Sequence, residues 1–229
     1  MANSSSLIIT SKITRSFQLS GVTVYALNDI SLHIPKGKLT VLQGPSGSGK
    51  TTLINILGAL DKPDSGSVLF EGKDIVTITD QQRDELRRLK MGFVFQSVAL
   101  IGNMSASENL DFALRVAGFN AKERYNRVQE CLSLVGLSTR INHKPGELSG
   151  GEQQRVSIAR AIAHTPSVLF ADEPTAELDS HTGLQIIQLI KTFVEQYGST
   201  VIMSSHDPFI VEIADNVIQI EDGYLSGEK

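Results

Sequence analysis

The sequence lacks the features that mark secreted and membrane-spanning proteins. It has one cysteine, Cys131, among 229 residues, so no disulfide can form within the chain and a reducing compartment is expected. No apolar run approaches the ~20 residues that a membrane-spanning helix needs. Residues 1–6 are polar and carry no basic stretch before an apolar core, so we expect no secretion signal. We therefore expect a soluble protein, in which any membrane role comes through a partner.

The sequence also lacks a surplus of basic residues. It has 21 basic and 25 acidic residues and a net charge of −4, which argues against a nucleic-acid partner. Repeats, low-complexity tracts and long coiled-coil heptads are missing too. Apolar residues make up 41% and charged residues 20%, as in ordinary globular proteins. A chain of this length can form one α/β domain with its own core.

The hydrophobic pattern predicts strands separated by helices. Strands are expected at residues 7–13, 31–34, 39–43, 68–70, 91–95, 168–171 and 200–204, and a helix at 185–197. Residues 80–164 are mostly helical in pattern, with helix-starting capping boxes at Thr79–Gln82 and Ser105–Glu108. This pattern implies a largely parallel sheet with a helical insertion. An apolar stripe along residues 122–135 suggests that Cys131 is a packed core residue rather than a reactive thiol; its other members are Tyr125, Val128, Leu132 and Val135.

A glycine-rich loop follows the strand at 39–43 and opens an apolar helix. Its glycines allow successive N–H groups to point inward around a phosphate, and the helix N-terminus adds partial positive charge. Lys50 can reach the β- and γ-phosphates, and the Thr51 hydroxyl can ligate Mg²⁺. The alternative is a plain glycine turn, and the motif alone leaves kinases and GTPases open. The predicted nucleotide-binding residues are Gly44, Pro45, Ser46, Gly47, Ser48, Gly49, Lys50, Thr51 and Thr52.

The apolar strand at 168–171 ends in two carboxylates, Asp172 and Glu173. Ligands bind at the carboxyl edge of open α/β sheets, where such acids would emerge. Asp172 would hold Mg²⁺, and Glu173 would polarise the attacking water as general base. The alternative is that Asp172 caps a helix, since Pro174 follows closely.

A second helix start lies at residues 148–153. Ser149 and Glu152 have capping-box spacing, and Gly150 and Gly151 leave the N–H groups of the first turn unshielded. This turn predicts a second anion site, far in sequence from the first. The alternative is an ordinary capped helix start.

These motifs together resemble the ABC ATPase family over essentially the whole chain. Residues 148–155 resemble the family's signature motif, and four further positions match in order: Phe17 (the aromatic A-loop residue), Gln96 (the Q-loop), Asp179 (the D-loop) and His206 (the switch histidine). Residues 44–53, 91–96 and 143–145 are most similar to the ATPases of lipoprotein-release and macrolide-efflux exporters.

The resemblance implies an α/β fold: a P-loop NTPase (RecA-like) core with an N-terminal antiparallel β subdomain and an inserted α-helical subdomain. We expect one ABC ATPase domain over 1–229, with the core and β subdomain at 1–95 and 165–229 and the helical subdomain at 96–164. It also implies an enzyme that hydrolyses ATP with Mg²⁺.

The resemblance further implies roles for particular residues. The catalytic residues are Glu173, His206 and Gln96, and the metal-binding ones are Thr51, Gln96 and Asp172. Phe17 stacks on adenine, and ATP is shared across a homodimer. The residues expected at that shared site are Ser149, Gly150, Gly151, Glu152 and Asp179.

An integral-membrane permease is the implied partner, and the implied location is the cytoplasmic face of the cell membrane. We expect the permease to dock near residues 96–108, where Phe95, Val98, Leu100, Ile101 and Met104 supply apolar surface. An ABC ATPase of a mechanotransmission or antimicrobial-peptide-sensing complex is the alternative. DNA- and ribosome-associated members need coiled coils, zinc insertions or fused cassettes, which this sequence lacks.

Overall fold

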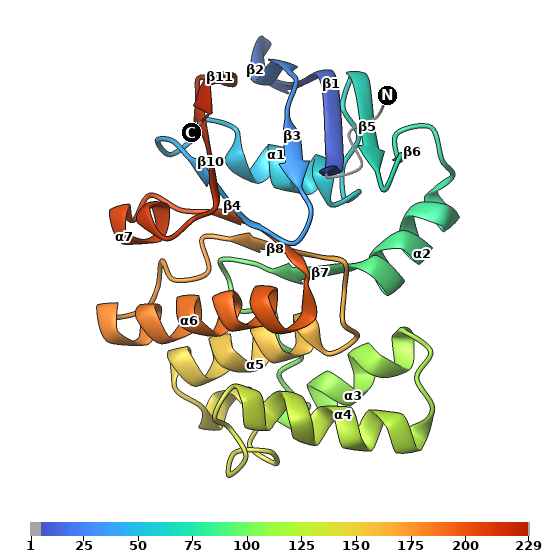
Figure 1. The fold of residues 1–229 in the computed structure, drawn as a ribbon, viewed down its shortest axis with the longest axis vertical. Helices are drawn as coiled ribbons and strands as arrows, with labels where there is room; N and C mark the ends of the chain where they lie inside the picture. Colours follow the sequence, from blue (N-terminus) through green and yellow to red (C-terminus); the bar gives the residue numbers. More distant parts are fainter. Residues whose placement is uncertain (1–5, 229) are drawn as a thin grey trace.

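The structure, a computed structural model, describes residues 6–228, with the side chain of residue 228 left out. The predicted absence of a secretion signal concerns residues 1–6 and so falls almost entirely outside the described part. Two sheets and their helices are stacked along the long axis of the molecule, and a helical insert lies at the end opposite the antiparallel sheet (Figure 1). No helix in the described range is both long and apolar enough to cross a bilayer.

The central sheet has six strands in the order β11-β10-β4-β9-β8-β7. Adjacent strands from β10 to β7 are parallel, and only the edge strand β11 is antiparallel. The predicted largely parallel sheet is therefore confirmed. The bounds are β4 Leu39–Gln43, β7 Met91–Val94, β8 Val168–Asp172, β9 Thr200–Ser204, β10 Asn216–Glu221 and β11 Tyr224–Glu228.

Helices cover both faces of this sheet, which explains why the middle residues of its parallel strands are mostly apolar. Val168 and Phe170 of β8 point to the face covered by α1 (Lys50–Leu57). Leu169 and Ala171 alternate with them and point to the other face, covered by α5 (Gly150–Ile162) and α6 (Ser180–Tyr197). The short helix α7 (Pro208–Glu212) packs at this second face through Ile210. Helices α1 and α5 thus lie on opposite faces of one sheet.

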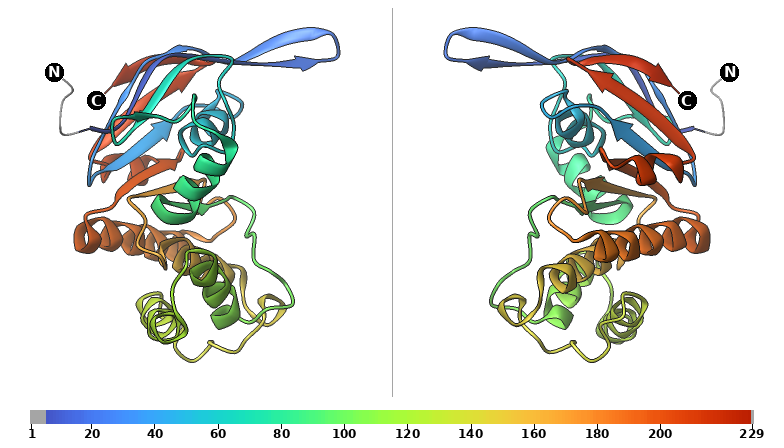
Figure 2. Two further views of the ribbon diagram at one scale, coloured as in Figure 1. Left: turned by 90° about the vertical axis from the view of Figure 1, so that its right-hand side faces the viewer. Right: turned by 90° about the vertical axis from the view of Figure 1, so that its left-hand side faces the viewer.

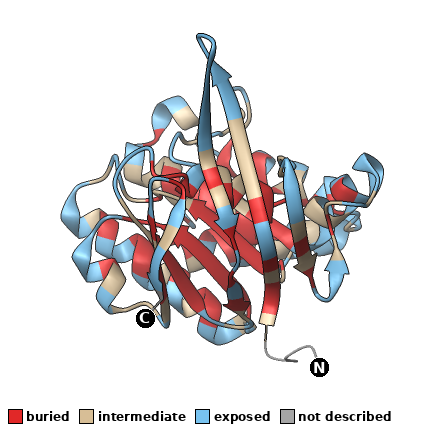
Figure 3. Cartoon of the chain, turned by 90° about the horizontal axis from the view of Figure 1, so that it is seen from above, coloured by how far each residue is buried: buried red, intermediate tan, exposed pale blue. Residues whose placement is uncertain are grey.

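The second sheet is antiparallel and packs over α1. It contains β1 (Ser6–Leu19), β2 (Val22–Ile30), β3 (His33–Pro35), β5 (Ser65–Phe70) and β6 (Lys73–Asp74). Its inner residues share a core cluster with α1 and the central sheet. The outer half of the β1–β2 hairpin projects beyond the rest of the protein, and its side chains are exposed (Figures 2 and 3).

The helical insert has a core of its own, formed by α3 (Ala106–Val116), α4 (Ala121–Leu134) and one side of α5, which contributes Val156 and Ala159, with Ala163 at its C-terminal end. Helix α2 (Asp80–Lys90) precedes β7 and packs against the first cluster through Leu86. The capping boxes predicted at Thr79–Gln82 and Ser105–Glu108 are confirmed, with each serine or threonine oxygen accepting from the N3 amide.

Most of the predicted elements are confirmed, with some shifts at their ends. Strands 39–43 and 200–204 match to the residue, while 7–13 extends to Leu19 and the helix predicted at 185–197 begins at Ser180. The predictions omit β2, β6, β10, β11 and α7. Cys131 is buried as predicted, and burial raises the pKa of its thiol to about 11. Tyr125 is 68% exposed, so its place in the predicted apolar stripe is wrong.

Candidate functional site

The predicted residues of the phosphate loop, the two acids, His206 and Gln96 come together because the strands that precede them are parallel. Parallel strands end at the same edge of a sheet, and this edge is where open α/β sheets bind ligands. Strands β4, β8 and β9 end in the phosphate loop, in Asp172 and before His206, respectively, and Gln96 lies two residues beyond β7. Four segments that are far apart in the sequence therefore meet along one edge.

The phosphate loop joins β4 to α1, and two of its glycines are required by close backbone contacts. Gly49 has φ 106°, and a Cβ there would lie 2.2 Å from the carbonyl oxygen of Ala26 in β2. A Cβ on Gly44 would lie 2.0 Å from the carbonyl oxygen of Ile220 in β10. Only glycine fits at either position. The loop is therefore held between the hairpin on one side and β10 on the other.

Two polar side chains of the loop are buried in a way that suits an anion. Lys50 is 6% exposed, and its Nζ donates to the carbonyl oxygens of Gly44 and Pro45, both at 2.9 Å. Lys50 therefore points back over its own loop. Among the described residues, the buried Ser48 hydroxyl has no hydrogen-bond partner. A buried ammonium, a free hydroxyl and the start of α1 fit a phosphate chain.

The two acids lie where the sequence predicts, at the carboxyl end of β8. Asp172 Oδ2 accepts from the Thr51 hydroxyl at 2.8 Å, which brings two of the three predicted metal ligands into contact. Glu173 has φ 44°, a left-handed conformation that is unfavourable for a non-glycine residue and typical of functional sites. No helix starts at Asp172, because the next helix is α6 and its N-cap is Asp179. The helix-cap alternative for Asp172 is therefore wrong.

The donor set suits Mg²⁺ held together with phosphates. A hydroxyl and a carboxylate are hard oxygen ligands, which Mg²⁺ prefers, and Mg²⁺ commonly uses only one or two carboxylates plus substrate phosphates. Within the described range no group of three or more His, Cys, Asp or Glu residues forms an all-protein metal cage. Thr51 and Asp172 are thus compatible with the predicted metal.

Two residues of this edge were missed by the sequence analysis. The Ser204 hydroxyl donates to Asp172 Oδ1 at 2.6 Å and accepts from the Glu173 amide at 2.8 Å. The Gln154 amide, buried in α5, donates to the Pro174 carbonyl oxygen at 2.8 Å. Pairing the strands predicted at 168–171 and 200–204 as parallel neighbours would have placed Ser204 beside Asp172.

His206 lies on the loop after β9 and is exposed. It lines a cleft of about 400 Å³ together with Gln43, Gly44, Pro45 and residues of β10 and β11. The predicted switch histidine is thus next to the phosphate loop. Gln96 is exposed on the loop after β7, and no described hydrogen bond holds its side chain. Its side chain is free to turn toward the site.

The predicted second anion turn starts α5. Ser149 caps the helix, and Glu152 completes the capping box by accepting from the Ser149 amide at 2.8 Å. That hydrogen bond, together with Arg140 at 3.1 Å, lowers the pKa of Glu152. Gly150 faces open space, whereas a Cβ on Gly151 would lie 2.6 Å from the Thr182 methyl group. Gly151 therefore also allows α5 to approach α6.

Asp179 caps the helix that approaches Gly151. Its carboxylate accepts from the amides of His181 and Thr182 and from the Thr182 hydroxyl. These bonds, led by the one from the Thr182 hydroxyl, lower the pKa of Asp179. The predicted D-loop residue is therefore fixed as the N-cap of α6.

Phe17 lies on the projecting part of β1, with 39% of its surface exposed. The Arg15 guanidinium carbon is 4.9 Å from the centre of its ring, a cation–π contact. Asp61 and Asp64 hold Arg15 in place at 2.9 and 2.8 Å. Arg15 thus covers one face of the Phe17 ring.

The segment predicted to dock a partner is bound tightly to the helical insert. Asn109 of α3 is fully buried and accepts from the Ile101 amide at 2.9 Å, and its amide donates to three carbonyl oxygens, those of Ile101, Met104 and Ser105. Arg160 of α5 donates to the Ala99 carbonyl oxygen. Phe95 is 37% exposed, but Val98, Leu100, Ile101 and Met104 are half-buried, so part of the expected apolar surface is core.

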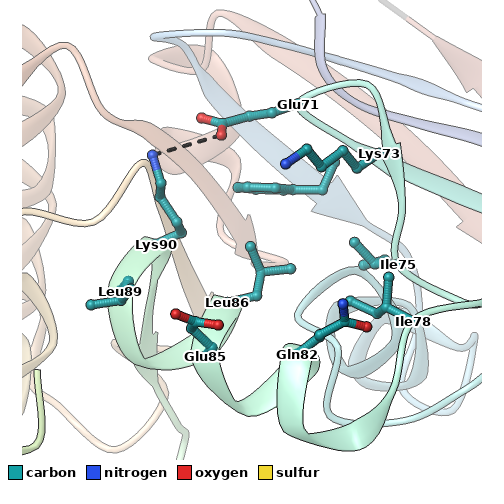
Figure 4. Close-up of a pocket in the computed structure, with 10 residues that line it drawn as sticks. Glu71, Lys73, Ile75, Ile78, Gln82, Glu85, Leu86, Leu89 and Lys90 are labelled. Atoms are coloured by element: carbon teal, nitrogen blue, oxygen red, sulfur yellow. Dashed lines mark ion pairs between the residues drawn. The ribbon is translucent and has the colours of Figure 1, made fainter.

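A further cavity, of about 350 Å³, lies between α2 and the β5–β6 turn (Figure 4). Ile75, Ile78 and Leu86 give it an apolar floor, and Glu71 and Lys90 face each other across its mouth at 3.7 Å. It contains none of the predicted site residues. The chemistry is therefore assigned to the sheet edge and not to this cavity.

Comparison with known proteins identifies close relatives. Residues 27–176 match the family described as ABC transporter. The macrolide export ATP-binding/permease protein MacB of Vibrio parahaemolyticus is 43% identical over 213 residues, covering 93% of this chain but 32% of that protein. The chain thus spans about a third of the length of the first relatives it matches. An uncharacterized ABC transporter ATP-binding protein of Thermotoga maritima is 42% identical, with 94% of this chain and 92% of that protein covered.

Two solved structures of an ATP-binding cassette are also similar to this chain. The dimeric post-hydrolysis state of the ATP-binding cassette MJ0796, bound to ADP and Pi, has a TM-score of 0.90 at 38% identity. A second dimeric structure of MJ0796 has a TM-score of 0.91 at 39% identity, and each match covers 97% of both chains. The MJ0796 protein of Methanocaldococcus jannaschii is 40% identical in sequence. The predicted P-loop NTPase core with its β subdomain and helical insert is confirmed.

Proposed function

The chain belongs to the ABC transporter family and is an ATP hydrolase, and on that premise we propose that two copies close around ATP and drive a membrane permease. One observation carries the proposal. The phosphate loop and the Ser149 turn begin helices on opposite faces of the central sheet, and we infer that one nucleotide does not contact both turns of the same chain. A second copy, turned head to tail, brings its Ser149 turn to the first copy's phosphate loop. The dimeric MJ0796 structures support this arrangement.

In this dimer each site is completed by both chains. The phosphate loop and Lys50 bind the β- and γ-phosphates, and Phe17 stacks on adenine. Ser149, Gly150 and Gly151 of the second copy donate to the γ-phosphate from the start of α5. Glu152 keeps that turn in shape through its bond to the Ser149 amide, and Asp179 orders the neighbouring turn of α6.

The acids perform the chemistry at the edge of the sheet. Thr51 and Asp172 would hold Mg²⁺, which neutralises phosphate charge when bound. Glu173 takes a proton from the attacking water, and its strained backbone sets the direction of its carboxylate. His206 holds the γ-phosphate, and Gln96 reaches the site from the loop after β7. Loss of the shared phosphate then weakens the contact between the two copies.

The permease would dock on the helical insert at the cytoplasmic face of the membrane. On α3 of the insert, Phe112 and Val116 lie one helical turn apart and are 46% and 49% exposed, and Phe95, just before the insert, is 37% exposed. Relatives named as macrolide export ATP-binding/permease proteins support an export permease as partner. Identifying the membrane protein that copurifies with the chain tests this, since a sensing complex would bring a non-transporting anchor.

Three variants test the dimer. Glu173→Gln should abolish turnover, keep ATP binding and elute as an ATP-dependent dimer on a sizing column. Lys50→Ala should lose nucleotide affinity, since a buried charge that meets the phosphates is removed. Ser149→Arg should bind ATP but not hydrolyse it, because the larger side chain blocks the start of α5.

Controls make the outcome decisive. Glu177→Gln removes an exposed acid of the same segment and should hydrolyse ATP and elute like the unmodified chain. A monomeric Glu173→Gln protein at saturating ATP, or normal turnover by Ser149→Arg, would contradict the shared-site arrangement.

A further inference from the structure

One buried hydroxyl connects the two acids of the site. Ser204 is the last residue of β9 and is fully buried. Its Oγ donates to Asp172 Oδ1 at 2.6 Å and accepts from the Glu173 amide at 2.8 Å. A serine hydroxyl has a single proton, and here it is committed to the carboxylate. The hydroxyl therefore donates to Asp172 and accepts from the Glu173 amide, and these roles cannot be exchanged.

Sheet register explains the contact. Strands β8 and β9 are adjacent and parallel, and Asp172 lies opposite Ser204. Paired residues of neighbouring strands put their side chains on the same face, so a short hydroxyl reaches the carboxylate directly. The Glu173 amide comes one residue after the end of β8, where the ladder stops and the amide needs another acceptor.

The chain of hydrogen bonds continues through Asp172 to the phosphate loop. Asp172 Oδ2 accepts from the Thr51 hydroxyl at 2.8 Å. Each carboxylate oxygen thus has its own hydroxyl donor, one from α1 and one from β9. The carboxylate is fixed in rotation about its Cβ–Cγ bond, because turning it would break both bonds.

Glu173 depends on the same hydroxyl for a different reason. Its φ of 44° is unfavourable for a residue with a side chain, so neighbouring contacts must maintain it. Ser204 holds the amide on one side, and Gln154 holds the Pro174 carbonyl oxygen on the other. Losing the first of these lets the peptide before Glu173 rotate.

We propose that Ser204 is a positioning residue for hydrolysis, whose hydroxyl orients the Asp172 carboxylate and holds the backbone of Glu173. The inference rests on the proposed roles of those two acids. No hydrogen bond of its side chain reaches the phosphate loop within the described residues. Ser204 therefore acts on turnover and on the metal dependence of nucleotide binding, and only weakly on metal-free binding.

The experiment compares Ser204→Ala with Ser199→Ala. Ser199, just before β9, is 5% exposed, and its hydroxyl donates to the Pro166 carbonyl oxygen at 2.8 Å. Both variants lose a buried serine hydrogen bond, so both should lower Tm by about 2–4 °C. Only Ser204→Ala should lower kcat, by about 10–100-fold, the scale of a misplaced catalytic group. Ser204→Thr keeps the hydroxyl and should restore kcat to within about 3-fold.

Binding provides a second readout that does not depend on turnover. In EDTA, the affinity of Ser204→Ala for ATP should change less than about 3-fold. Adding Mg²⁺ should then raise the affinity, and the Mg²⁺ concentration needed for half of this gain should be about 10-fold higher than for the unmodified chain. If the alanine variant does not fold, Ser204→Cys keeps the volume with a much weaker donor and should show the same losses.

Three results would overturn the proposal: normal kcat in a folded Ser204→Ala or Ser204→Cys protein, an equal loss in Ser199→Ala, or no recovery in Ser204→Thr. Failure of the proposed function is recognised separately. Lys50→Ala and Glu173→Gln would then hydrolyse ATP normally in the same assay, whatever the Ser204 variants do.

Discussion

Gly49 carries the most direct prediction about how this fold holds its phosphate loop. Its backbone is left-handed, with φ 106°, and a Cβ would lie 2.2 Å from the Ala26 carbonyl oxygen. Gly47, two residues earlier, is a matched control. It has φ 81°, and nothing lies within 4 Å of its added Cβ. Alanine at either position therefore adopts an unfavourable left-handed backbone conformation, but only alanine at Gly49 also clashes with a carbonyl oxygen.

The magnitudes follow from these two geometries. An L-residue in a left-handed conformation costs about 1–2 kcal/mol, so Gly47→Ala should lower the free energy of unfolding by that amount. At Gly49 the carbonyl oxygen must also move, and overpacking of this kind adds about 1–3 kcal/mol. Gly49→Ala should therefore cost about 2–5 kcal/mol. For a domain of this size, Tm should fall by about 2–8 °C in the control and about 4–20 °C in Gly49→Ala.

Thermal and urea unfolding of the nucleotide-free protein measure both variants. The predicted difference of about 1–3 kcal/mol reports the contact between the loop and the hairpin, since the backbone term cancels. Equal losses for the two variants, or a larger loss for Gly47→Ala, would refute the assignment of Gly49 to that contact.

Three further predictions concern other parts of the fold. Phe17→Ala should weaken ATP binding by about 1–3 kcal/mol, or about 5–150-fold, as measured by titration calorimetry. Phe17→Tyr should bind ATP with nearly normal affinity. Unchanged affinity in Phe17→Ala would show that Phe17 does not stack on the base. Asn109→Ala leaves the Ile101 amide without its acceptor, so it should cost about 1–3 kcal/mol of stability. It should also speed hydrogen exchange at residues 101–105 and leave ATP affinity within about 2-fold. Unchanged exchange would show that Asn109 does not hold this segment. Cys131 should react with a thiol reagent at pH 8 only as the protein unfolds. Because its folded pKa is about 11 against 9.0 for a free thiol, its stabilisation is complete below pH 9 and should be lost between pH 9 and 11, by up to about 2–3 kcal/mol relative to Cys131→Ala.

The parts that the sequence predicts well are those determined by nearby residues. Capping boxes depend on two residues three apart, and the phosphate loop on eight consecutive ones, so both can be read locally. Strands β4 and β9 are buried on both faces and show it as continuous apolar runs. The acids after β8 follow from the same rule.

The parts that were missed depend on pairing between distant segments. Strand β2 is exposed along its first half, and its conformation comes from its ladder with β1 rather than from a buried face. Tyr125 follows the helical period of α4, but its position meets no neighbouring element. The sequence around Ser204 does not indicate a contact with Asp172, which becomes apparent only from the register of β8 and β9.

In the proposed binding mode, the glycine contacts around the phosphate loop would also set the length of the nucleotide that fits. In the proposed binding mode the base rests on the hairpin and the phosphates on the loop, and Gly49 joins these two supports main chain to main chain. No rotamer change can lengthen or shorten that span, because no side chain separates the supports. Tolerance for longer or shorter ligands should therefore change on replacing Gly49 and stay nearly constant when residues elsewhere around the site are exchanged.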